Sequence, residues 1–255
     1  MQGCKGLYKE EIKRNIRRKI GDKAFDKVEK IYEAVMRIFG VKKDMPFRIR
    51  IVFGLYNRLE KRGRKNVLTL GTGRYLYNSF VIHGDHNLIR IGEGGTIKNV
   101  KFEIYGSYNS IVIGSKVSLR NAQIHLGDNG SSMHIGNNTY IGDGFHAGIL
   151  EGADISIGND CMFSVNTSLL NSDAHTIIDL ATGARMNNAL DIFIGNHVWF
   201  GQDVTVLKGA RIADDTIIGN KSMVTQGNYE GNSVYVGIPA RLQRGGYNGC
   251  MIGYS

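Results

Sequence analysis

The feature that most constrains the fold is a row of apolar residues spaced six apart in the C-terminal part of the sequence. The row runs without a miss through Ile194, Phe200, Val206, Ile212, Ile218 and Val224. Six residues of an α-helix turn through roughly 600°, which would spread such a row around the cylinder. A plain β-strand has a period of two, with no turn every six residues. The interval therefore predicts short strands joined by corners, three to a triangular coil, with large apolar side chains pointing inward.

A second row follows at the same interval and carries small or β-branched side chains. It consists of Val198, Val204, Ala210, Thr216 and Ser222. Glycine or asparagine stands next to the large apolar residue, as in 194–196 and 218–220, and these residue types tolerate a positive φ at a corner. Both features agree with a β-solenoid.

The upstream half repeats at a longer interval. Its Ile-Gly pairs end at Gly92, Gly114, Gly136 and Gly158, which are 22 residues apart. We interpret these repeats as coils of about 18 residues enlarged at one corner, although a β-solenoid with larger coils throughout stays open. Fixed periods of this kind are typical of stacked arrays, whereas an antiparallel sandwich would not require them.

The N-terminal quarter has a different pattern. From Tyr8 to about Leu59 the apolar residues recur at helical spacing, with breaks at 21–22 and 40–46, which predicts three short amphipathic helices. Residues 60–66 read as a charged connection. The expected organisation is a basic helical region over 1–66, an all-β solenoid over 67–245 with a loop at 170–190, and a tail over 246–255.

The net charge of +9 belongs to the N-terminal quarter. Residues 1–66 carry 20 Lys/Arg against 8 Asp/Glu, whereas residues 67–255 carry 12 against 15, which gives +12 and −3. The basic region is therefore expected to bind an anionic polysaccharide, to contact a membrane surface, or to form a helical cap on the first coil. No nucleic-acid-binding motif accompanies the charge, so nucleic acid is not expected as a partner.

Several other classes are disfavoured. The first twenty residues contain many charges, and no run of about 18 apolar residues occurs, so neither a signal peptide nor a membrane span is expected. The three cysteines lack metal-ligand spacing and are expected to be reduced. The expected location is the cytoplasm, with the inner membrane surface as an alternative. Rossmann and P-loop nucleotide motifs are absent from the sequence.

The strict repeat is interrupted once, between the Ile-Gly pairs at 157–158 and 194–195. The interruption contains Asn-Ser-Asp-Ala-His over 171–175 and Thr-Gly-Ala-Arg-Met-Asn over 182–187. A solenoid does not need this excursion for stability, and loops on a rigid scaffold often carry reactive groups. The interruption is therefore the first place to expect a functional site.

Four segments, at 157–162, 171–175, 194–201 and 236–241, make the sequence resemble the hexapeptide-repeat O-acetyltransferases. Within that family the loop is more similar to polysialic acid and other capsule O-acetyltransferases than to galactoside and maltose acetyltransferases. The resemblance covers about 135–245, is weaker over 67–134 and is absent before 66. It implies a left-handed parallel β-helix that transfers acetyl from acetyl-CoA to a sugar or polysaccharide hydroxyl.

The resemblance also implies roles for three side chains. His175 would be the general base, and this agrees with general chemistry, because an alcohol is a poor nucleophile and imidazole accepts protons near neutral pH. Asp173 would orient the imidazole or bind the sugar, although an aspartate in a turn often bonds its own backbone. Trp199 would line the donor and acceptor site, although it could simply cover a coil face. The other six histidines are expected to be solvated corner residues.

For the donor, the resemblance implies that CoA lies in a cleft between two neighbouring solenoids, and therefore a homotrimer. The residues expected to contact CoA are Gly201, Gln202, Asn220, Ser222, Thr225, Arg241 and Arg244. Gln226 stands where the family often has lysine, which removes one phosphate-pairing charge. No metal is expected to be required. Transfer is expected to be direct, in a ternary complex, with a backbone N–H stabilising the oxyanion.

Two rival functions stay open. One is an N-acetyltransferase that acts on an amino-sugar nucleotide. The other is a solenoid without catalysis, either a scaffold or a metal protein using His125, His134 and His146. The residues themselves identify neither the acceptor nor the length of the acyl group.

Overall fold

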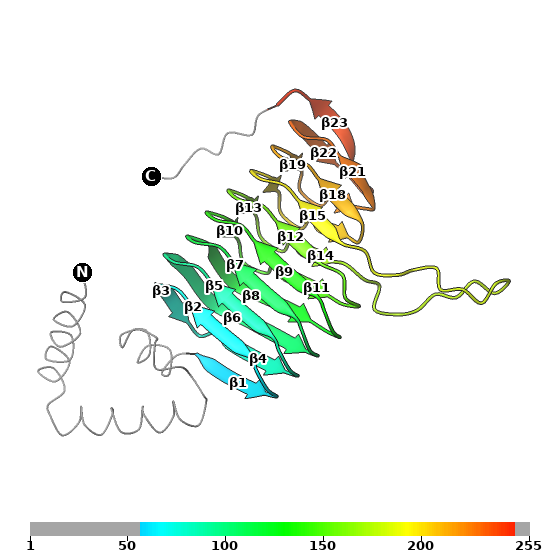
Figure 1. The fold of residues 1–255 in the computed structure, drawn as a ribbon. Helices are drawn as coiled ribbons and strands as arrows, with labels where there is room; N and C mark the ends of the chain where they lie inside the picture. The colour runs from blue at the N-terminus through cyan, green and yellow to red at the C-terminus, as the bar shows by residue number, and fades with distance from the viewer. Residues whose placement is uncertain (1–56, 248–255) are drawn as a thin grey trace, which may run out of the picture.

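The computed structural model describes residues 57–247, which wind into a parallel β-helix (Figure 1). Three short strands make up one coil, so three faces, which we number 1 to 3 in the order of the strands along each coil, run the length of the solenoid. Face 1 is one continuous sheet of eight strands, which corresponds to about eight coils. The parallel β-helix expected from the sequence is thus confirmed.

Face 1 is a parallel sheet in which every strand pairs with its equivalent in the next coil. Its strands are β2 (Val67–Leu70), β5 (Leu88–Ile91), β7 (Ser110–Ile113), β9 (Ser132–Ile135), β12 (Ile155–Ile157), β15 (Ile192–Ile194), β18 (Ala210–Ile212) and β21 (Gly227–Tyr229).

Faces 2 and 3 are joined into one sheet because two long strands, β6 (Gly95–Tyr105) and β8 (Ser118–Leu126), pass round the corner between them. Face 2 also contains β3 (Gly73–Leu76), β10 (Tyr140–Ile141), β13 (Met162–Phe163), β16 (Trp199–Phe200), β19 (Ile217–Ile218) and β22 (Ser233–Val236). The last strand, β23 (Arg241–Gly245), pairs antiparallel with β22 and ends the stack. Face 3 also contains β1 (Arg58–Arg62), β4 (Ser79–His83), β11 (His146–Ile149), β14 (Ser168–Leu170), β17 (Thr205–Leu207) and β20 (Met223–Val224).

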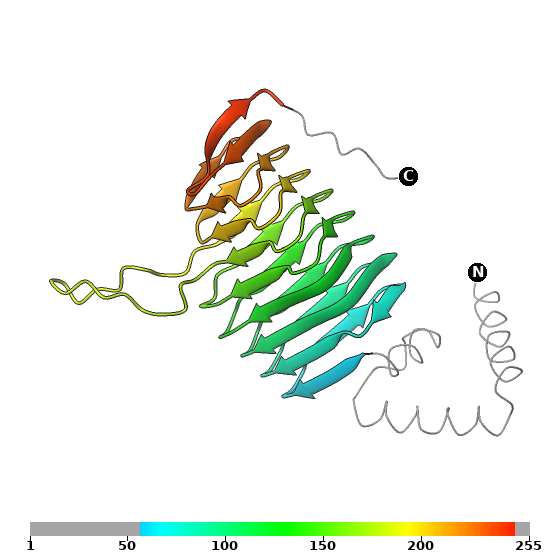
Figure 2. The same cartoon turned by 180° about the vertical axis from the view of Figure 1, so that it is seen from behind.

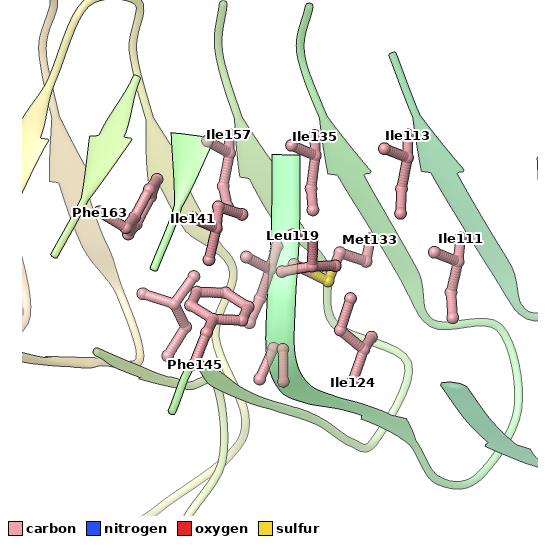
Figure 3. Packing of buried hydrophobic residues seen from close by; sticks show 14 of the residues in the cluster. Ile111, Ile113, Leu119, Ile124, Met133, Ile135, Ile141, Phe145, Ile157 and Phe163 are labelled. Atoms are coloured by element: carbon pink, nitrogen blue, oxygen red, sulfur yellow. The ribbon is translucent and has the colours of Figure 1, made fainter. Parts of the chain in front are cut away.

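The core consists of inward-pointing rows, as the six-residue interval predicted. Every member of the row from Ile194 to Val224 is at most 1% exposed, and every member of the second row, from Val198 to Ser222, is at most 2% exposed. Figure 3 shows the same arrangement upstream, where Ile113, Ile135 and Ile157 stand one above another in successive coils. Because each coil buries its apolar side chains only against its neighbours, the stack is stabilised coil by coil.

Phenylalanines stack inside the C-terminal half of this core. The rings of Phe163 and Phe200, from paired strands, lie 4.5 Å apart between centroids with an interplanar angle of 15°. Phe145 meets Phe163 edge to face at 5.7 Å. All three rings are at most 1% exposed. These contacts join three successive coils in the core.

The corner between faces 3 and 1, which we call the variable corner, explains the two coil lengths. Strand pairing makes Gly148 and Leu207 equivalent, and likewise Ile155 and Ala210. The chain takes seven steps from Gly148 to Ile155 but three from Leu207 to Ala210. The 22-residue coils are therefore 18-residue coils enlarged by four residues at one corner, which confirms that interpretation.

Asparagine side chains stabilise the enlarged variable corner. The Oδ1 atoms of Asn66, Asn87 and Asn109 each accept the backbone N–H of the equivalent residue in the next coil, at 2.9 Å. Between these rungs the chain passes very close to itself: a Cβ on Gly106, whose φ is +117°, would lie 1.6 Å from the carbonyl oxygen of Asp128. Only glycine fits there.

The start of the solenoid differs from the expectation. Residues Arg58–Arg62 form β1, which pairs with β4, so the described solenoid begins at Arg58 rather than at residue 67. Leu59 is the one inward-pointing apolar side chain of β1. The charged residues around it made the segment resemble a solvated connection in the sequence. The three expected helices otherwise lie outside the described residues, as does the tail from residue 248. Among residues 57–247, no helix has the length and apolarity needed to cross a membrane.

Candidate active site

One long loop, residues 171–190, leaves the solenoid at the variable corner between β14 and β15. Figures 1 and 2 show it as an arm that extends well away from the stack of coils. It stands at the same corner that is enlarged in the upstream coils and tight in the downstream ones. The loop is therefore a long insertion at one corner, and the strands on either side of it pair with those of the neighbouring coils without interruption.

The two ends of the loop are closed by a buried asparagine. The Oδ1 atom of Asn171 accepts the backbone N–H of Leu150 at 2.9 Å, and its Nδ2 donates to the Leu150 carbonyl at 3.2 Å. The backbone N–H of Leu190 donates to the Asn171 carbonyl at 3.1 Å. Asn171 is 0% exposed, so these bonds are shielded from water. The base of the loop is thus fixed to the preceding coil.

A second asparagine, Asn187, holds the backbone around the candidate base. Its Nδ2 donates to the His175 carbonyl at 2.6 Å and to Asp173 Oδ2 at 2.8 Å, while its Oδ1 accepts the N–H of Ile177 at 2.7 Å. Asn187 is 7% exposed. Its three bonds span both strands of the loop, so they set where the His175 backbone lies.

Asp173 contacts the next coil through a lysine. Lys208 Nζ donates to Asp173 Oδ2 at 2.5 Å and to the Asn187 carbonyl at 3.2 Å. The hydrogen bond from Lys208, and after it the bond from Asn187, hold the pKa of Asp173 below its usual value. Asp173 makes no hydrogen bond with the imidazole in this chain; its carboxylate anchors the loop to the corner that follows β17.

An ion pair ties the other side of the loop to the preceding coil. Arg185 Nη2 lies 2.7 Å from Glu151 Oε2, and Ser172 Oγ donates to Glu151 Oε1 at 2.6 Å. Arg185 first, and then Ser172, lower the pKa of Glu151. Glu151 follows β11 at the variable corner, so the loop is clamped between the coil before it and the coil after it.

His175 itself is exposed, and its ring makes no hydrogen bond with any residue between 57 and 247. Ala174, just before it, has a φ of +60°, which marks a tight turn at this point. The backbone of His175 is therefore held while its imidazole is left free. A ring in this position can accept a proton from an incoming hydroxyl.

Trp199 lies on a different side of the solenoid. It is 46% exposed on β16, on face 2, and the variable corner is the corner opposite face 2 in the triangular coil. Trp199 stands in an outward-facing row with Tyr140, which is also exposed, and with Met162 and Ile217, which are half-buried. A single chain therefore does not bring Trp199 and His175 together.

The residues expected to contact CoA fall into three places. Gly201, Gln202, Asn220 and Ser222 lie at the corner between faces 2 and 3, Thr225 lies at the variable corner, and Arg241 and Arg244 lie on β23.

Some of these residues have structural partners within the chain. The Oδ1 atom of Asn220 accepts the N–H of Gln202 at 2.8 Å. Ser222 is 2% exposed and its hydroxyl accepts the N–H of Gly237 at 3.0 Å, so Ser222 offers no surface to a ligand. Arg241 is exposed, and Arg244 is also exposed, with its guanidinium over the Tyr247 ring at 5.1 Å.

Several curated proteins match part of this sequence. The chain is 49% identical over 61 residues to a polysialic acid O-acetyltransferase of Neisseria meningitidis, which is 24% of this chain and 28% of that protein. It is 32% identical over 112 residues to a galactoside O-acetyltransferase of Lactococcus lactis, which is 42% of this chain and 53% of that protein. The chain thus spans about a quarter to a half of the length of these curated relatives. No family model matches it.

A solved structure agrees over a longer range. The polysialic acid O-acetyltransferase OatWY superposes with a TM-score of 0.69 at 27% identity, covering 77% of this chain and 93% of that one. The resemblance to hexapeptide-repeat O-acetyltransferases is confirmed. The superposition covers more of the chain than residues 135–255, so the structural similarity reaches the coils upstream of residue 135, where the sequence motifs were weak.

From the sequence, no role was assigned to the residues that hold the long loop in place, Glu151, Arg185, Asn187 and Lys208. A signal for Lys208 was its position, because it occupies the same corner as the loop one coil later. Adjacent coils contribute side chains to the same corner, so the residues that position a loop can lie one repeat away from it.

The remaining histidines do not gather around one point. His125 and His146 lie on face 3, and His134 lies on face 1. Within residues 57–247 no three His, Cys, Asp or Glu side chains are grouped so as to hold a metal ion. His197 pairs with Asp215 at 2.6 Å on the corner between faces 1 and 2.

Proposed function

We propose that this protein is an acetyl-CoA-dependent O-acetyltransferase that acts on a hydroxyl of a sugar or polysaccharide. One observation carries the proposal: the only long loop of the described solenoid presents an unbonded imidazole, His175, on a backbone fixed by Asn187. The similarity to sugar and polysialic acid O-acetyltransferases, which is strongest for a segment of 61 residues, supports the same reaction.

In the proposed reaction His175 takes the proton of the acceptor hydroxyl as its oxygen bonds to the thioester carbonyl carbon of acetyl-CoA. A backbone N–H would donate to the oxyanion of the tetrahedral intermediate. When the C–S bond breaks, the imidazolium returns the proton to the departing thiolate. The products are the acetyl ester and CoA, and no oxidant or metal enters the balance.

An acyl-enzyme on Cys161, the one cysteine between residues 57 and 247, does not suit the structure. Cys161 is 0% exposed inside the coils, and burial raises the pKa of its thiol to about 11. The thiolate is the nucleophilic form of cysteine, so this thiol is both inaccessible and protonated at neutral pH. Direct transfer in a ternary complex is therefore the mechanism that we propose.

The proposal is tested by measuring CoA release from acetyl-CoA with different acceptors. We expect release with an anionic polysaccharide, polysialic acid being the first to try, or with a galactoside, and an alkali-labile ester in the product. Release only with amino-sugar nucleotides, with an amide product, would instead show the N-acetyltransferase. Absence of release with every acceptor class would contradict both transferase functions.

We also propose that the active site forms between two copies of this chain, in a homotrimer. Two exposed apolar surfaces support this. The loop carries Ile177, Ile178, Leu180 and Met186, of which Leu180 is 100% exposed, and face 2 carries the row around Trp199. Exposed patches of this kind usually mark interfaces. A contact between the loop of one copy and face 2 of the next is heterologous; such contacts form a closed ring when the rotation between copies closes, which in the proposed homotrimer is a rotation of one third of a turn.

The shared site predicts complementation between two defective variants. His175→Ala and Trp199→Ala should each be strongly impaired alone. When both are co-expressed, about one quarter of the sites would combine an intact His175 with an intact Trp199 from the neighbouring copy. Activity of the purified mixture, measured as CoA release, should rise to about that fraction of the wild-type value. A mixture no more active than the two variants measured separately would contradict the shared site.

The basic N-terminal region and the cytoplasmic location remain predictions. The partners expected for that region are an anionic polysaccharide, a membrane surface or the first coil.

A further inference from the structure

A stacked pair of rings stands at the variable corner upstream of the loop. His86 and Tyr108 occupy equivalent positions in successive coils, and their rings stack with centroids 4.9 Å apart at an interplanar angle of 14°. Both have a positive φ, 60° and 62°, which turns their side chains outward from the corner. Tyr108 is 67% exposed. Nothing in the core requires these rings, so they form an outward-facing aromatic platform.

A second group of rings flanks this platform on the edge of face 3. Tyr105 is 40% exposed, and its ring meets His83 edge to face at 5.2 Å and His125 at 5.7 Å. The rings come from three successive strands of face 3, β4, β6 and β8. Together with His86 and Tyr108 they make an aromatic surface, which we call the corner track, along the same edge of the solenoid that carries the His175 loop.

Charge is distributed unevenly along the solenoid. Residues 57–105 carry 9 Lys/Arg against 4 Asp/Glu, whereas residues 106–247 carry 8 against 12. Arg64 and Lys65 stand at the variable corner one coil before His86, and Lys65 has the same positive φ as the two ring residues. The corner track thus runs from a basic end of the solenoid toward the loop.

The acidic side chains along the track are already bonded. Asp85 accepts the backbone N–H of Arg64 at 2.7 Å and forms an ion pair with the Arg64 guanidinium at 3.4 Å. Asp128 accepts the N–H of Glu151 at 3.2 Å, and Glu151 is paired with Arg185. Because Arg64 already pairs with Asp85, a negatively charged ligand at the basic end would meet the exposed Lys65 and the rings.

We propose that the corner track binds sugar units of an anionic polysaccharide acceptor at a distance from the reacting hydroxyl. This inference rests on the proposed transferase function. The flat apolar faces of pyranose rings pack against exposed aromatic faces, and an acidic group on the polymer pairs with Lys65. A polymer that lies along the corner would present one internal unit to His175 while units further along contact Tyr108 and His86.

The distance between the platform and the loop can be spanned by a polymer bound at His175 but not by a short acceptor bound there. Three coil steps separate Tyr108 from the base of the loop, and adjacent strands lie about 4.8 Å apart, so the platform lies roughly 14 Å along the axis from the loop. An acceptor of one or two sugars at His175 cannot reach that far. The track therefore predicts that longer anionic acceptors bind more tightly than short ones.

The test compares the wild type with the double variant His86→Ala/Tyr108→Ala on size-fractionated polysialic acid. The wild type should have a lower KM for long chains than for short oligomers, and the variant should lose this advantage, with a roughly 5–10-fold increase in the KM for long chains. Direct binding of long chains without acetyl-CoA should weaken by the same factor. His134→Ala, an exposed histidine on face 1, is the matched control and should behave as the wild type.

The results of this experiment can distinguish failure of the corner track from failure of the proposed transferase function. If no acceptor is acetylated but long chains still bind the wild type and not the variant, the transferase function fails while the track stands. Equal KM values for long and short chains in the wild type would overturn the track. An equal loss of binding in His134→Ala would also overturn the track. So would displacement of the polymer by a single-stranded oligonucleotide of arbitrary sequence at equal concentration, since aromatic rings and cations also bind nucleic acid.

Discussion

Replacing His175 with alanine should lower the rate of CoA release by about 10²–10⁴-fold, because a positioned general base contributes a factor of this size. The effect should fall on kcat, since the imidazole acts on the hydroxyl proton as the new bond forms. Acetyl-CoA binding, measured by calorimetry, should be retained. The backbone bonds from Asn187 are made to the His175 carbonyl and are unaffected by the change of side chain.

The control for this prediction is the stability of the variant. The His175 ring is exposed and unbonded within the described residues, so the midpoint of thermal unfolding should be the same as in the wild type. His134→Ala, which removes an exposed ring from face 1, should keep full activity. Turnover of His175→Ala within tenfold of the wild-type value would refute the role of this histidine.

Replacing Phe163 with alanine should cost about 3–5 kcal/mol of stability, the range found when a buried aromatic ring is removed. Phe163 is 0% exposed and contacts both Phe145 and Phe200, so its loss leaves a cavity between three successive coils that cannot collapse without disturbing their stacking. For a domain of this size the midpoint of thermal unfolding should fall by roughly 10 °C. Circular dichroism during heating measures this change.

Val165→Ala is the matched control, because Val165 lies two positions further along the same coil and is 37% exposed. It should shift the midpoint by no more than a degree or two. A shift for Phe163→Ala as small as that of Val165→Ala would show that the phenylalanine stack does not stabilise the solenoid.

The coil architecture could be predicted from the sequence because the constraint repeats. Each coil must place one large apolar side chain inward on each face, so the six-residue interval between Ile194 and Phe200 is repeated along the chain and can be recognised in the sequence. The 22-residue interval was also interpretable, because adding residues at one corner preserves the pairing of the strands. The start of the solenoid at β1 was not predicted, since this strand buries a single apolar residue, Leu59, and one residue cannot show a periodic pattern.

The candidate site was predictable only in part. The position of His175 in the single interruption of the repeat, and its resemblance to a known motif, identified it as the candidate base. The side chains that hold it, Asn187, Lys208 and Glu151, were not identified, because the bonds that join them cross between coils and leave no regular spacing in the sequence. The sequence left open whether Asp173 orients the imidazole, binds the sugar or bonds its own backbone, and only the structure shows that its carboxylate pairs with Lys208.

The sequence by itself determined the solenoid and the place of its one long interruption, since both follow from a periodic requirement to bury apolar side chains, and the resemblance to a known motif singled out the histidine in that interruption. Only the tertiary structure decided that the enlarged corners and the loop share one edge, that Trp199 lies on the opposite face, and that His86 and Tyr108 stack upstream of the loop. The physical reason is that stacking converts a separation of about twenty residues along the chain into one strand spacing, and which side chains then meet depends on corner geometry that the period does not encode.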